Sequence, residues 1–178
     1  VTPFVQLPSG SRIEFRLARR DPDGNCTNGV TRTVSYETFN GGENVKYLAP
    51  AWPRSSYMNV WVVSNIGSGA AGYTYYPGTV SADRDGIILN HSYLGSIGTG
   101  NSNRSRTLTH EVGHWLNLPH PWGSTNEPEL SSNCNIDDGI SDTPNTIGHT
   151  SCVLYAQSCG SLDNVQNYMD YSYCTNMF

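Results

Sequence analysis

The chain has 178 residues, a length that suits one domain with a single principal core. Its net charge of −5 and its single lysine, Lys46, argue against a nucleic-acid-binding protein, because binding to a phosphate backbone needs a concentrated basic surface. No apolar run approaches the roughly 20 residues of a membrane-spanning helix. We therefore expect neither nucleic acid nor a membrane as a partner.

The first half of the chain predicts short strands around one broken helix. In residues 12–17 apolar side chains alternate with charged ones, a pattern typical of a half-buried strand. Residues 36–48 can form a helix that is interrupted by a pair of glycines near its middle. We expect further strands in three segments: residues 57–64, 73–76 and 85–91.

The clearest helix is expected at residues 107–116. Ser102 or Ser105 can cap its first turn, and Asn117 with Pro119 stops it. The sequence then becomes rich in Pro, Gly, Ser, Asn and Asp, and an irregular stretch of such length needs crosslinks or other ties. We therefore expect strands and a helix first, and an irregular, crosslinked region after them.

Four of the five cysteines lie in the last quarter of the chain: Cys134, Cys152, Cys159 and Cys174. None of their spacings is the C-x-x-C of a zinc ribbon or redox pair, so we expect two disulfides, for which three pairings are open. Cys26 would be left over as a partly buried thiol. Disulfides imply an oxidising compartment, and the start at Val1, without Met or a leader, is typical of a processed product. We therefore expect a secreted protein.

Residues 110–120 read HEVGHWLNLPH and contain the side chains that a catalytic zinc site needs. Residues four apart lie on the same face of a helix, so His110 and His114 can present both imidazoles to one metal ion. Glu111 is placed beside the metal, where it can take a proton from a bound water. His120 can supply the third protein ligand, and zinc then keeps one open position for catalysis.

Asn117 makes the return of His120 to the metal feasible. A residue near this position must adopt the left-handed conformation for the chain to turn back, and Asn tolerates that conformation best after Gly. Pro119 then prevents the helix from continuing. Two histidines four apart around a glutamate can occur by chance, but a third histidine after such a turn favours a zinc site. A purely structural zinc site is disfavoured, because those sites usually hold four ligands rich in Cys.

Together with Asn167-Tyr168-Met169-Asp170-Tyr171 downstream, the elongated zinc motif resembles that of the metzincin metallopeptidases, and among them most the pappalysin family. Four further segments of the sequence resemble the pappalysin family: residues 21–25, 106–109, 121–123 and 142–144. The resemblance covers nearly the whole chain and implies an α+β, metzincin-like fold in one catalytic domain, residues 1–178. Its upper lobe (about 1–117) would hold a twisted, mostly parallel sheet and the active-site helix, and its lower lobe (about 118–178) would be irregular and disulfide-linked.

The resemblance also implies roles for individual residues. Met169 would be the hydrophobic floor beneath the metal, a position that suits a soft thioether. Tyr171 would swing toward the metal and help to stabilise the oxyanion, the alternative being an ordinary packing tyrosine. The upper rim of the cleft, which binds an extended peptide by strand addition, would be formed by Gly72, Tyr73 and Thr74. The implied disulfides are Cys134–Cys159 and Cys152–Cys174.

The acidic run at residues 137–143 offers several hard oxygen ligands, and the related peptidases carry calcium here. Its spacing does not match an EF-hand, so a solvated turn is the alternative. The candidate ligands of a structural calcium ion are Asp137, Asp138, Asp142 and Thr143.

These observations predict a secreted endopeptidase with one catalytic zinc ion and Glu111 as general base. Two alternatives stay open: a zinc amidase acting on cell-wall peptides, and a non-catalytic, zinc-stabilised binding module. We expect a monomer whose partner is a protein or peptide substrate, and the resemblance adds an inhibitory pro-segment outside this chain. Some relatives read a basic residue after the scissile bond with an Asp that has no counterpart near Ser172 and Tyr173, so we do not carry this preference over.

Overall fold

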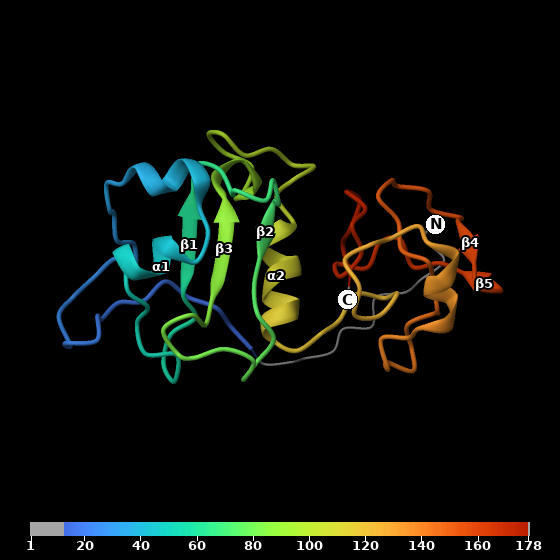
Figure 1. The fold of residues 1–178 in the computed structure, drawn as a ribbon, viewed down its shortest axis with the longest axis horizontal. Helices are drawn as coiled ribbons and strands as arrows, with labels where there is room; N and C mark the ends of the chain where they lie inside the picture. Colours follow the sequence, from blue (N-terminus) through green and yellow to red (C-terminus); the bar gives the residue numbers. More distant parts are fainter. Residues whose placement is uncertain (1–12, 178) are drawn as a thin grey trace.

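The computed structural model describes residues 13–177. Figure 1 shows two parts joined by the segment that follows helix α2: a sheet flanked by helices, and a largely irregular region. We call them the N-terminal part (residues 13–117) and the C-terminal part (residues 118–177). Within the described range, no helix combines the length and the apolar character that crossing a membrane requires.

The N-terminal part is built on a three-stranded sheet with the strand order β1-β3-β2. β1 (Val60–Val63) and β3 (Ile87–Asn90) are parallel, and β2 (Gly72–Tyr73) pairs antiparallel with the other side of β3. Residues 87–89 are completely buried, as expected for a central strand that is covered on both faces. β2 is therefore an edge strand of the sheet.

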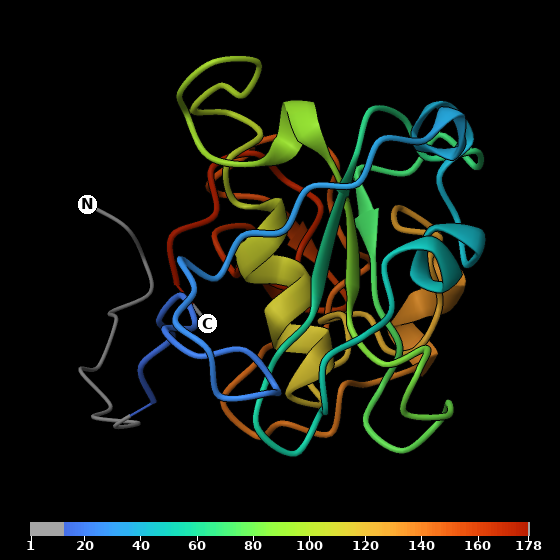
Figure 2. The same cartoon turned by 90° about the vertical axis from the view of Figure 1, so that its left-hand side faces the viewer.

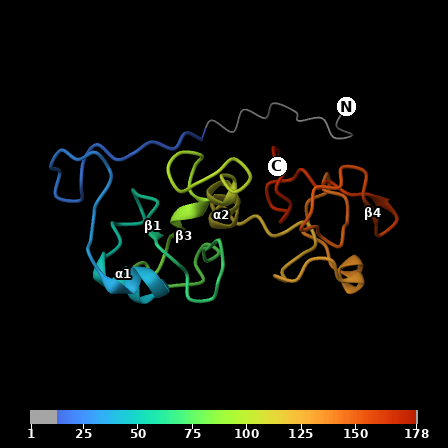
Figure 3. The ribbon, with the colours of Figure 1, turned by 90° about the horizontal axis from the view of Figure 1, so that it is seen from above.

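Helices cover both faces of this sheet. α2 (Thr107–Trp115) packs against β3 and β2 on one face, while α1 (Asn44–Leu48) lies on the opposite face (Figures 2 and 3). Two 3-10 helices complete the N-terminal part, η1 (Tyr36–Asn40) ahead of α1 and η2 (His91–Tyr93) directly after β3. The sheet thus lies between α2 and the α1 layer.

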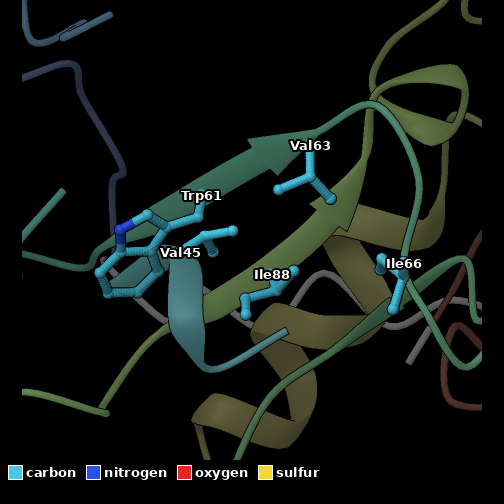
Figure 4. Packing of buried hydrophobic residues seen from close by; sticks show 5 residues of the cluster. All are labelled: Val45, Trp61, Val63, Ile66 and Ile88. Atoms are coloured by element: carbon cyan, nitrogen blue, oxygen red, sulfur yellow. The ribbon is translucent and has the colours of Figure 1, made fainter. Parts of the chain in front are cut away.

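A compact apolar cluster fills the space between α1 and the sheet (Figure 4). Its members are Val45 from α1, Trp61 and Val63 from β1, Ile66, and Ile88 from β3. The indole of Trp61 donates its Nε1–H to the backbone carbonyl of Ala49 over 2.7 Å, so the one polar atom of this ring is satisfied inside the core.

Lys46 is buried next to this cluster and ties α1 to the rim of the sheet. Its Nζ donates to the carbonyl of Arg84 over 2.6 Å and lies 3.2 Å from the Glu43 carboxylate. The hydroxyl of Tyr73 on β2 donates to the same carboxylate over 2.9 Å. The ammonium group also lies 5.2 Å from the ring centroid of Trp61. These contacts satisfy the buried charge and hold β2 from behind.

The C-terminal part has little regular structure. It contains η3 (Ser131–Asn135) and a short hairpin of β4 (Gln157–Ser158) and β5 (Ser161–Leu162). Two disulfides staple it, one from η3 to the hairpin turn and one close to the end of the chain. They join Cys134 to Cys159 and Cys152 to Cys174, the two pairs that the resemblance implies.

A buried polar network supports the C-terminal part where helices and strands are lacking. The completely buried carboxylate of Asp163 accepts the hydroxyl of Ser158 over 2.9 Å and lies 2.8 Å from Nε2 of His149. The side-chain amide of Asn133 donates to two backbone carbonyls, those of residues 127 and 147. Buried groups of this kind keep their hydrogen bonds, so the network fixes the course of the loops.

Two expectations for the N-terminal region were wrong. Residues 13–17 form no strand and their apolar side chains are exposed, while residue 12 lies outside the described residues. Alternating apolar and charged side chains give a strand only where a neighbouring strand forms hydrogen bonds with its backbone N–H and C=O groups. No described strand pairs with this segment. Cys26 was expected to be partly buried, but its thiol is free and exposed. Its backbone forms an isolated antiparallel β-bridge with that of Arg20.

The other N-terminal elements lie close to their predicted ranges, and α2 begins at the predicted Thr107 but is capped differently. Its N-cap is Arg106, without a side-chain cap, so the prediction of a serine cap was wrong. The hydroxyl of Ser105 instead donates to the carbonyl of Ser102 over 3.0 Å. The broken helix is found as η1 and α1, and the strands are shorter than the patterns that predict them.

Candidate metal centre and active site

Three histidines meet at the C-terminal end of α2. His110 and His114 lie one turn apart on the same face of the helix, with ring centroids 4.6 Å apart. The ring of His120 lies 4.6 Å from that of His114 and 5.3 Å from that of His110. One nitrogen from each ring falls within 4.8 Å of the other two. The structure therefore brings the three predicted ligands together.

Asn117 turns the chain back toward this cluster. Its φ of +76° lies in the left-handed region, as the sequence analysis expects. The N–H of Asn117 donates to the carbonyl of His114, and the N–H of Leu118 to that of Gly113, both over 2.9 Å. This pair of bonds is the Schellman motif that ends many helices. The motif brings His120 back to the helix face that carries the other two histidines.

Each histidine ring is oriented by one hydrogen bond from Nδ1 to a backbone carbonyl. A carbonyl can only accept, so each Nδ1 carries the proton and each Nε2 keeps its lone pair. The three acceptors, for His110, His114 and His120 in that order, are the carbonyls of Tyr168 (2.7 Å), Leu118 (2.7 Å) and Thr125 (2.9 Å). Backbone carbonyls in this position are the usual partners of metal-binding histidines.

The electrostatics of the three rings favour a bound cation. Burial, together with the neighbouring histidines, lowers the pKa of His110 to about 4 and that of His120 to about 3, and burial also lowers the pKa of His114. The rings are therefore neutral near pH 7. Nε2 of His114 and Nε2 of His120 lie 3.1 Å apart, and two lone pairs that face each other need a positive group between them. Three neutral imidazoles are a donor set that suits zinc.

Glu111 lies beside the histidines and is only 5% exposed. Burial raises the pKa of its carboxyl to about 8. The side chain packs against the rim strand β2, because a methyl group added to Gly72 would come within 3.2 Å of Oε1 of Glu111. Gly72 therefore gives the carboxyl the room that any larger side chain would take away.

The turn that contains Met169 lies under the N-terminal histidine of the motif. The N–H of Asp170 donates to the carbonyl of Asn167 over 3.0 Å, and the side-chain oxygen of Asn167 accepts the N–H of Met169 over 2.8 Å. This tight turn presents the carbonyl of Tyr168 to His110. Met169 itself is buried, and its role as the floor of the site stays a prediction.

Two tyrosines flank the histidines from opposite sides. The ring of Tyr171 lies 4.9 Å from that of His120 and 5.5 Å from that of His110. The ring of Tyr76, in the segment after β2, lies 5.5 Å from that of His114. Burial raises the pKa of Tyr171 to about 12 and also raises that of Tyr76, with the Glu111 carboxylate adding to both shifts. Both hydroxyls therefore stay protonated and can donate hydrogen bonds.

The histidines and Glu111 line a cleft of about 1000 Å³ that residues of both parts enclose. The predicted rim residues Gly72, Tyr73 and Thr74 line it, and so does the segment around Tyr171. Because β2 is an edge strand, an extended chain can reach its backbone from this cleft. The cleft is open enough to admit a peptide and has the candidate base and metal ligands in its wall.

The acidic run lies outside this cleft. Asp138 is half-buried and accepts the N–H of Ile140 over 2.9 Å, and burial raises the pKa of its carboxyl. Asp137 and Asp142 are exposed. Within residues 13–177, the histidine triad is the sole set of three or more His, Cys, Asp or Glu side chains placed to share a metal ion. The calcium site stays a prediction.

Sequence reasoning gave no role to two aromatic residues of the site. Tyr76 lies only two residues after the predicted rim in the sequence. This closeness to the rim is the signal that could have pointed to it. Trp122 follows His120 by two residues and is completely buried, with its ring stacked on the imidazole at 4.4 Å. Neither residue carries a charge at neutral pH, and only the folded chain places them against the histidines.

The family model Peptidase_M43, described as pregnancy-associated plasma protein-A, matches residues 41–178. The chain belongs to this family. The resemblance to the pappalysins that the motifs predict is thereby confirmed. The match includes the histidines, Glu111 and the turn around Met169.

Two curated members of comparable sequence are fungal proteins named extracellular metalloprotease. The one from Trichophyton verrucosum is 34% identical over 189 residues and covers 100% of this chain and 64% of its own length. The one from Arthroderma otae is 34% identical over 182 residues and covers 96% of this chain and 60% of its own. The chain thus spans less than two thirds of the length of these relatives.

Solved structures of mirolysin share the fold of this M43 chain. Mature mirolysin of Tannerella forsythia, in complex with a cleaved peptide, has 35% sequence identity and a TM-score of 0.76, covering 96% of this chain and 67% of its own. Mirolysin in complex with compound 9 has 37% identity and a TM-score of 0.80, covering 96% and 68%. These similarities confirm the α+β, metzincin-like fold.

Proposed function

We propose that this chain is the catalytic domain of a secreted, zinc-dependent endopeptidase. One observation carries the proposal: three neutral imidazoles each offer a ring nitrogen within 4.8 Å of the other two, beside the buried Glu111 and in the wall of a cleft of about 1000 Å³. Membership of a peptidase family and the metalloprotease names of the fungal relatives support the same activity.

His110, His114 and His120 would hold the zinc ion. Bound zinc supplies a Lewis acid that polarises the scissile carbonyl and lowers the pKa of a water molecule toward roughly 7. The chain contributes the orientation of the three rings, which hydrogen bonds to backbone carbonyls fix. Preorientation of this kind lowers the cost of ordering the ligands.

Glu111 would act as the general base. Its carboxylate accepts the proton of the attacking water and afterwards donates it to the nitrogen of the leaving amine. Burial alone holds the pKa of this group at about 8, close to neutrality, and a nearby positive charge favours the ionised form that a base needs. Gly72 leaves the carboxyl the room that it occupies beside β2.

Tyr171, and with it Tyr76, would bind the oxyanion of the tetrahedral intermediate. Both rings contact the histidines and both hydroxyls are protonated at neutral pH. A donor that meets the charge only as it develops stabilises the transition state more than the substrate. Tyr76 would serve this role from the side of the rim strand, and Tyr171 from the side of the C-terminal part.

The substrate would be an extended peptide that adds to the edge of β2. The complex of mature mirolysin with a cleaved peptide supports a peptide in the corresponding cleft. The names of the fungal relatives support secretion, and the promirolysin structure, 38% identical with a TM-score of 0.75, supports an inhibitory pro-segment. A calcium ion at residues 137–143 and a monomeric state belong to the same proposal as expectations from the resemblance.

The test is digestion of a diverse peptide library by the zinc-loaded protein, with products identified by mass spectrometry. We expect internal cuts that a chelator abolishes and that added zinc restores. Replacing Glu111 by Gln should lower kcat at least about a hundredfold while zinc stays bound, because general base catalysis is worth that much. Glu127→Gln, which changes an exposed glutamate outside the cleft, is the matched control and should leave kcat unchanged.

Two results would contradict the proposal. If Glu111→Gln retains near-native kcat, Glu111 is not the base. If the folded, zinc-loaded protein cuts no library peptide but releases peptides from cell-wall fragments, the amidase alternative replaces the endopeptidase.

A further inference from the structure

We propose that Trp122 is the positioning residue of the third metal ligand, and that it sets how tightly the protein holds zinc. The inference rests on the proposed function in taking zinc as the metal of the histidine site. It goes beyond that function in assigning a role to a residue that neither binds the metal nor contacts the substrate. The three histidines differ in how firmly the backbone holds them.

His110 and His114 are fixed by the helix that carries them, whereas His120 lies on a loop. The backbone at His120 belongs to a turn. This turn is closed by a hydrogen bond of 2.8 Å from the N–H of Gly123 to the carbonyl of His120. No helix or strand of the described residues includes this position. The orientation of the imidazole of His120 therefore depends on what packs against the ring.

The indole of Trp122 is what packs against it. The two rings are stacked with an angle of 3° between their planes and a centroid distance of 4.4 Å. Parallel stacking fixes the plane of the imidazole and leaves only rotation within that plane. The plane of a histidine ring determines where its Nε2 lone pair points, so the indole determines whether His120 meets the metal correctly.

A shared acceptor fixes the remaining rotation. The carbonyl oxygen of Thr125 accepts Nδ1–H of His120 over 2.9 Å and also Nε1–H of Trp122 over 3.0 Å. The two stacked rings therefore donate to one oxygen. The indole holds that oxygen at the point where Nδ1 of His120 must find it, which keeps the proton on Nδ1 and the lone pair on Nε2.

The indole is itself held without freedom to move. Trp122 is completely buried. A methyl group on Gly148 would lie only 2.3 Å from Cε3 of the indole, so the backbone of residue 148 closes on the face of the ring. The ring of Tyr171 meets the indole edge-on at 5.0 Å and the imidazole of His120 edge-on at 4.9 Å. Trp122 therefore positions Tyr171 as well as His120.

The test compares zinc affinity among folded variants, measured by competition with a chromophoric chelator. Trp122→Phe keeps a stacking ring but removes the indole N–H, and we expect about tenfold weaker zinc binding, the lower end of what partners of metal-binding histidines contribute. Trp122→Leu removes both contacts, and we expect a loss toward about a hundredfold. In the cobalt-loaded protein the visible absorption bands should change in shape, because the geometry of the third ligand changes.

Trp61→Phe is the matched control. It also removes an indole N–H that donates to a backbone carbonyl, that of Ala49, in the apolar core of the N-terminal part. We expect this variant to lower the melting temperature of the metal-free protein and to leave zinc affinity and the cobalt spectrum unchanged. Gly148→Ala provides a second route to the same question, because it displaces the indole without altering it and should also weaken zinc binding.

If the Trp122 variants and Gly148→Ala bind zinc as the wild type does, Trp122 has only a packing role and the proposal is overturned. If Trp61→Phe weakens zinc binding equally, general destabilisation explains the loss and the proposal is again overturned. A wild-type protein that binds zinc but cuts no peptide contradicts the proposed function alone, since the affinity comparison needs no substrate. A wild-type protein that binds no zinc contradicts both.

Discussion

The backbone of Gly72 and the carboxyl of Glu111 leave no room for a side chain between them at the edge of the sheet. A Cβ atom at position 72 would lie 3.2 Å from Oε1 of Glu111 and 2.9 Å from Cδ1 of Leu89. The strand β2, which would bind a peptide, and the helix α2, which carries the proposed base, therefore lie directly beside each other. The position of either one constrains the other.

This contact predicts that Gly72→Ala impairs catalysis more than stability. The added methyl group would push Glu111 away from its place, and small misplacements of a catalytic group can cost about a hundredfold in rate. We expect kcat/KM on a library-derived peptide to fall by about ten- to a hundredfold. Gly42→Ala is the control, because its new methyl group would meet its nearest neighbour at an ordinary 3.5 Å. Equal activity of the two variants would show that the contact has no consequence.

The turn at Asn117 predicts a graded effect on stability. Its φ of +76° costs a residue with a Cβ atom about 1 kcal/mol or more, and costs Gly nothing. Asn117→Gly should therefore be neutral or slightly stabilising, whereas Asn117→Ala should lower the free energy of unfolding by about 1 kcal/mol. Denaturant titration of the metal-free protein measures both. If the alanine variant is the more stable one, the left-handed turn is not what limits this position.

For the buried lysine, Lys46, we expect substitution to lower the free energy of unfolding by more than the changes at Asn117. The Lys46 side chain is 1% exposed, and its removal would leave the Arg84 carbonyl and the Glu43 carboxylate without their buried partner. Glu43 keeps its ion pair with Arg84 at 2.8 Å, so we expect Lys46→Ala to cost about 2–4 kcal/mol, at or below the usual cost of breaking a buried pair.

Arg54→Gln is the comparison for Lys46→Ala, because it breaks the pair of the exposed Arg54 with the partly buried Asp85 and should cost under about 1 kcal/mol. Thermal and denaturant unfolding of both variants provide the measurement. Similar losses from the two changes would contradict the importance of burial.

Asp170 predicts an unusual dependence of stability on pH. Burial raises the pKa of its carboxyl from 3.8 to about 6, although it accepts the N–H groups of His149 and Tyr171. The folded state therefore favours the protonated form. Stability from this group is fully present below pH 3.8, and it is lost as the pH rises through about 6. Most carboxyl groups have the opposite effect.

Asp170→Asn removes this titration while keeping an oxygen that can accept both N–H groups. We expect the difference in free energy of unfolding between variant and wild type to shift in favour of the variant as the pH rises from about 4 to about 6. A difference that stays constant over this range would mean that Asp170 ionises in the fold as readily as in the unfolded chain.

The sequence was most informative where chemistry demands a spacing. His110 and His114 can share a metal only at a helical separation, and Asn117 is one of few residues that permit the turn after them, so ligands and turn were predictable. The strand expected at residues 12–17 failed because pairing is a property of two segments, and the pattern of one segment cannot supply it. Trp122 was noted only within the segment that matches the family and was given no role of its own, because its contribution arises from the plane of its ring. Ring planes depend on the tertiary contacts of the C-terminal part.

The three carbonyls that orient the histidines come from three different stretches of the chain: the end of α2, the loop at Thr125, and the turn before Met169. The last stretch lies only a few residues from Cys174, one end of a disulfide. The orientation of His110 therefore depends on a crosslinked segment far along the sequence as well as on its own helix. We expect a chain whose cysteines are still reduced to hold the carbonyl of Tyr168, and with it the ring of His110, less firmly, because the Cys152–Cys174 disulfide crosslinks the segment that carries this carbonyl.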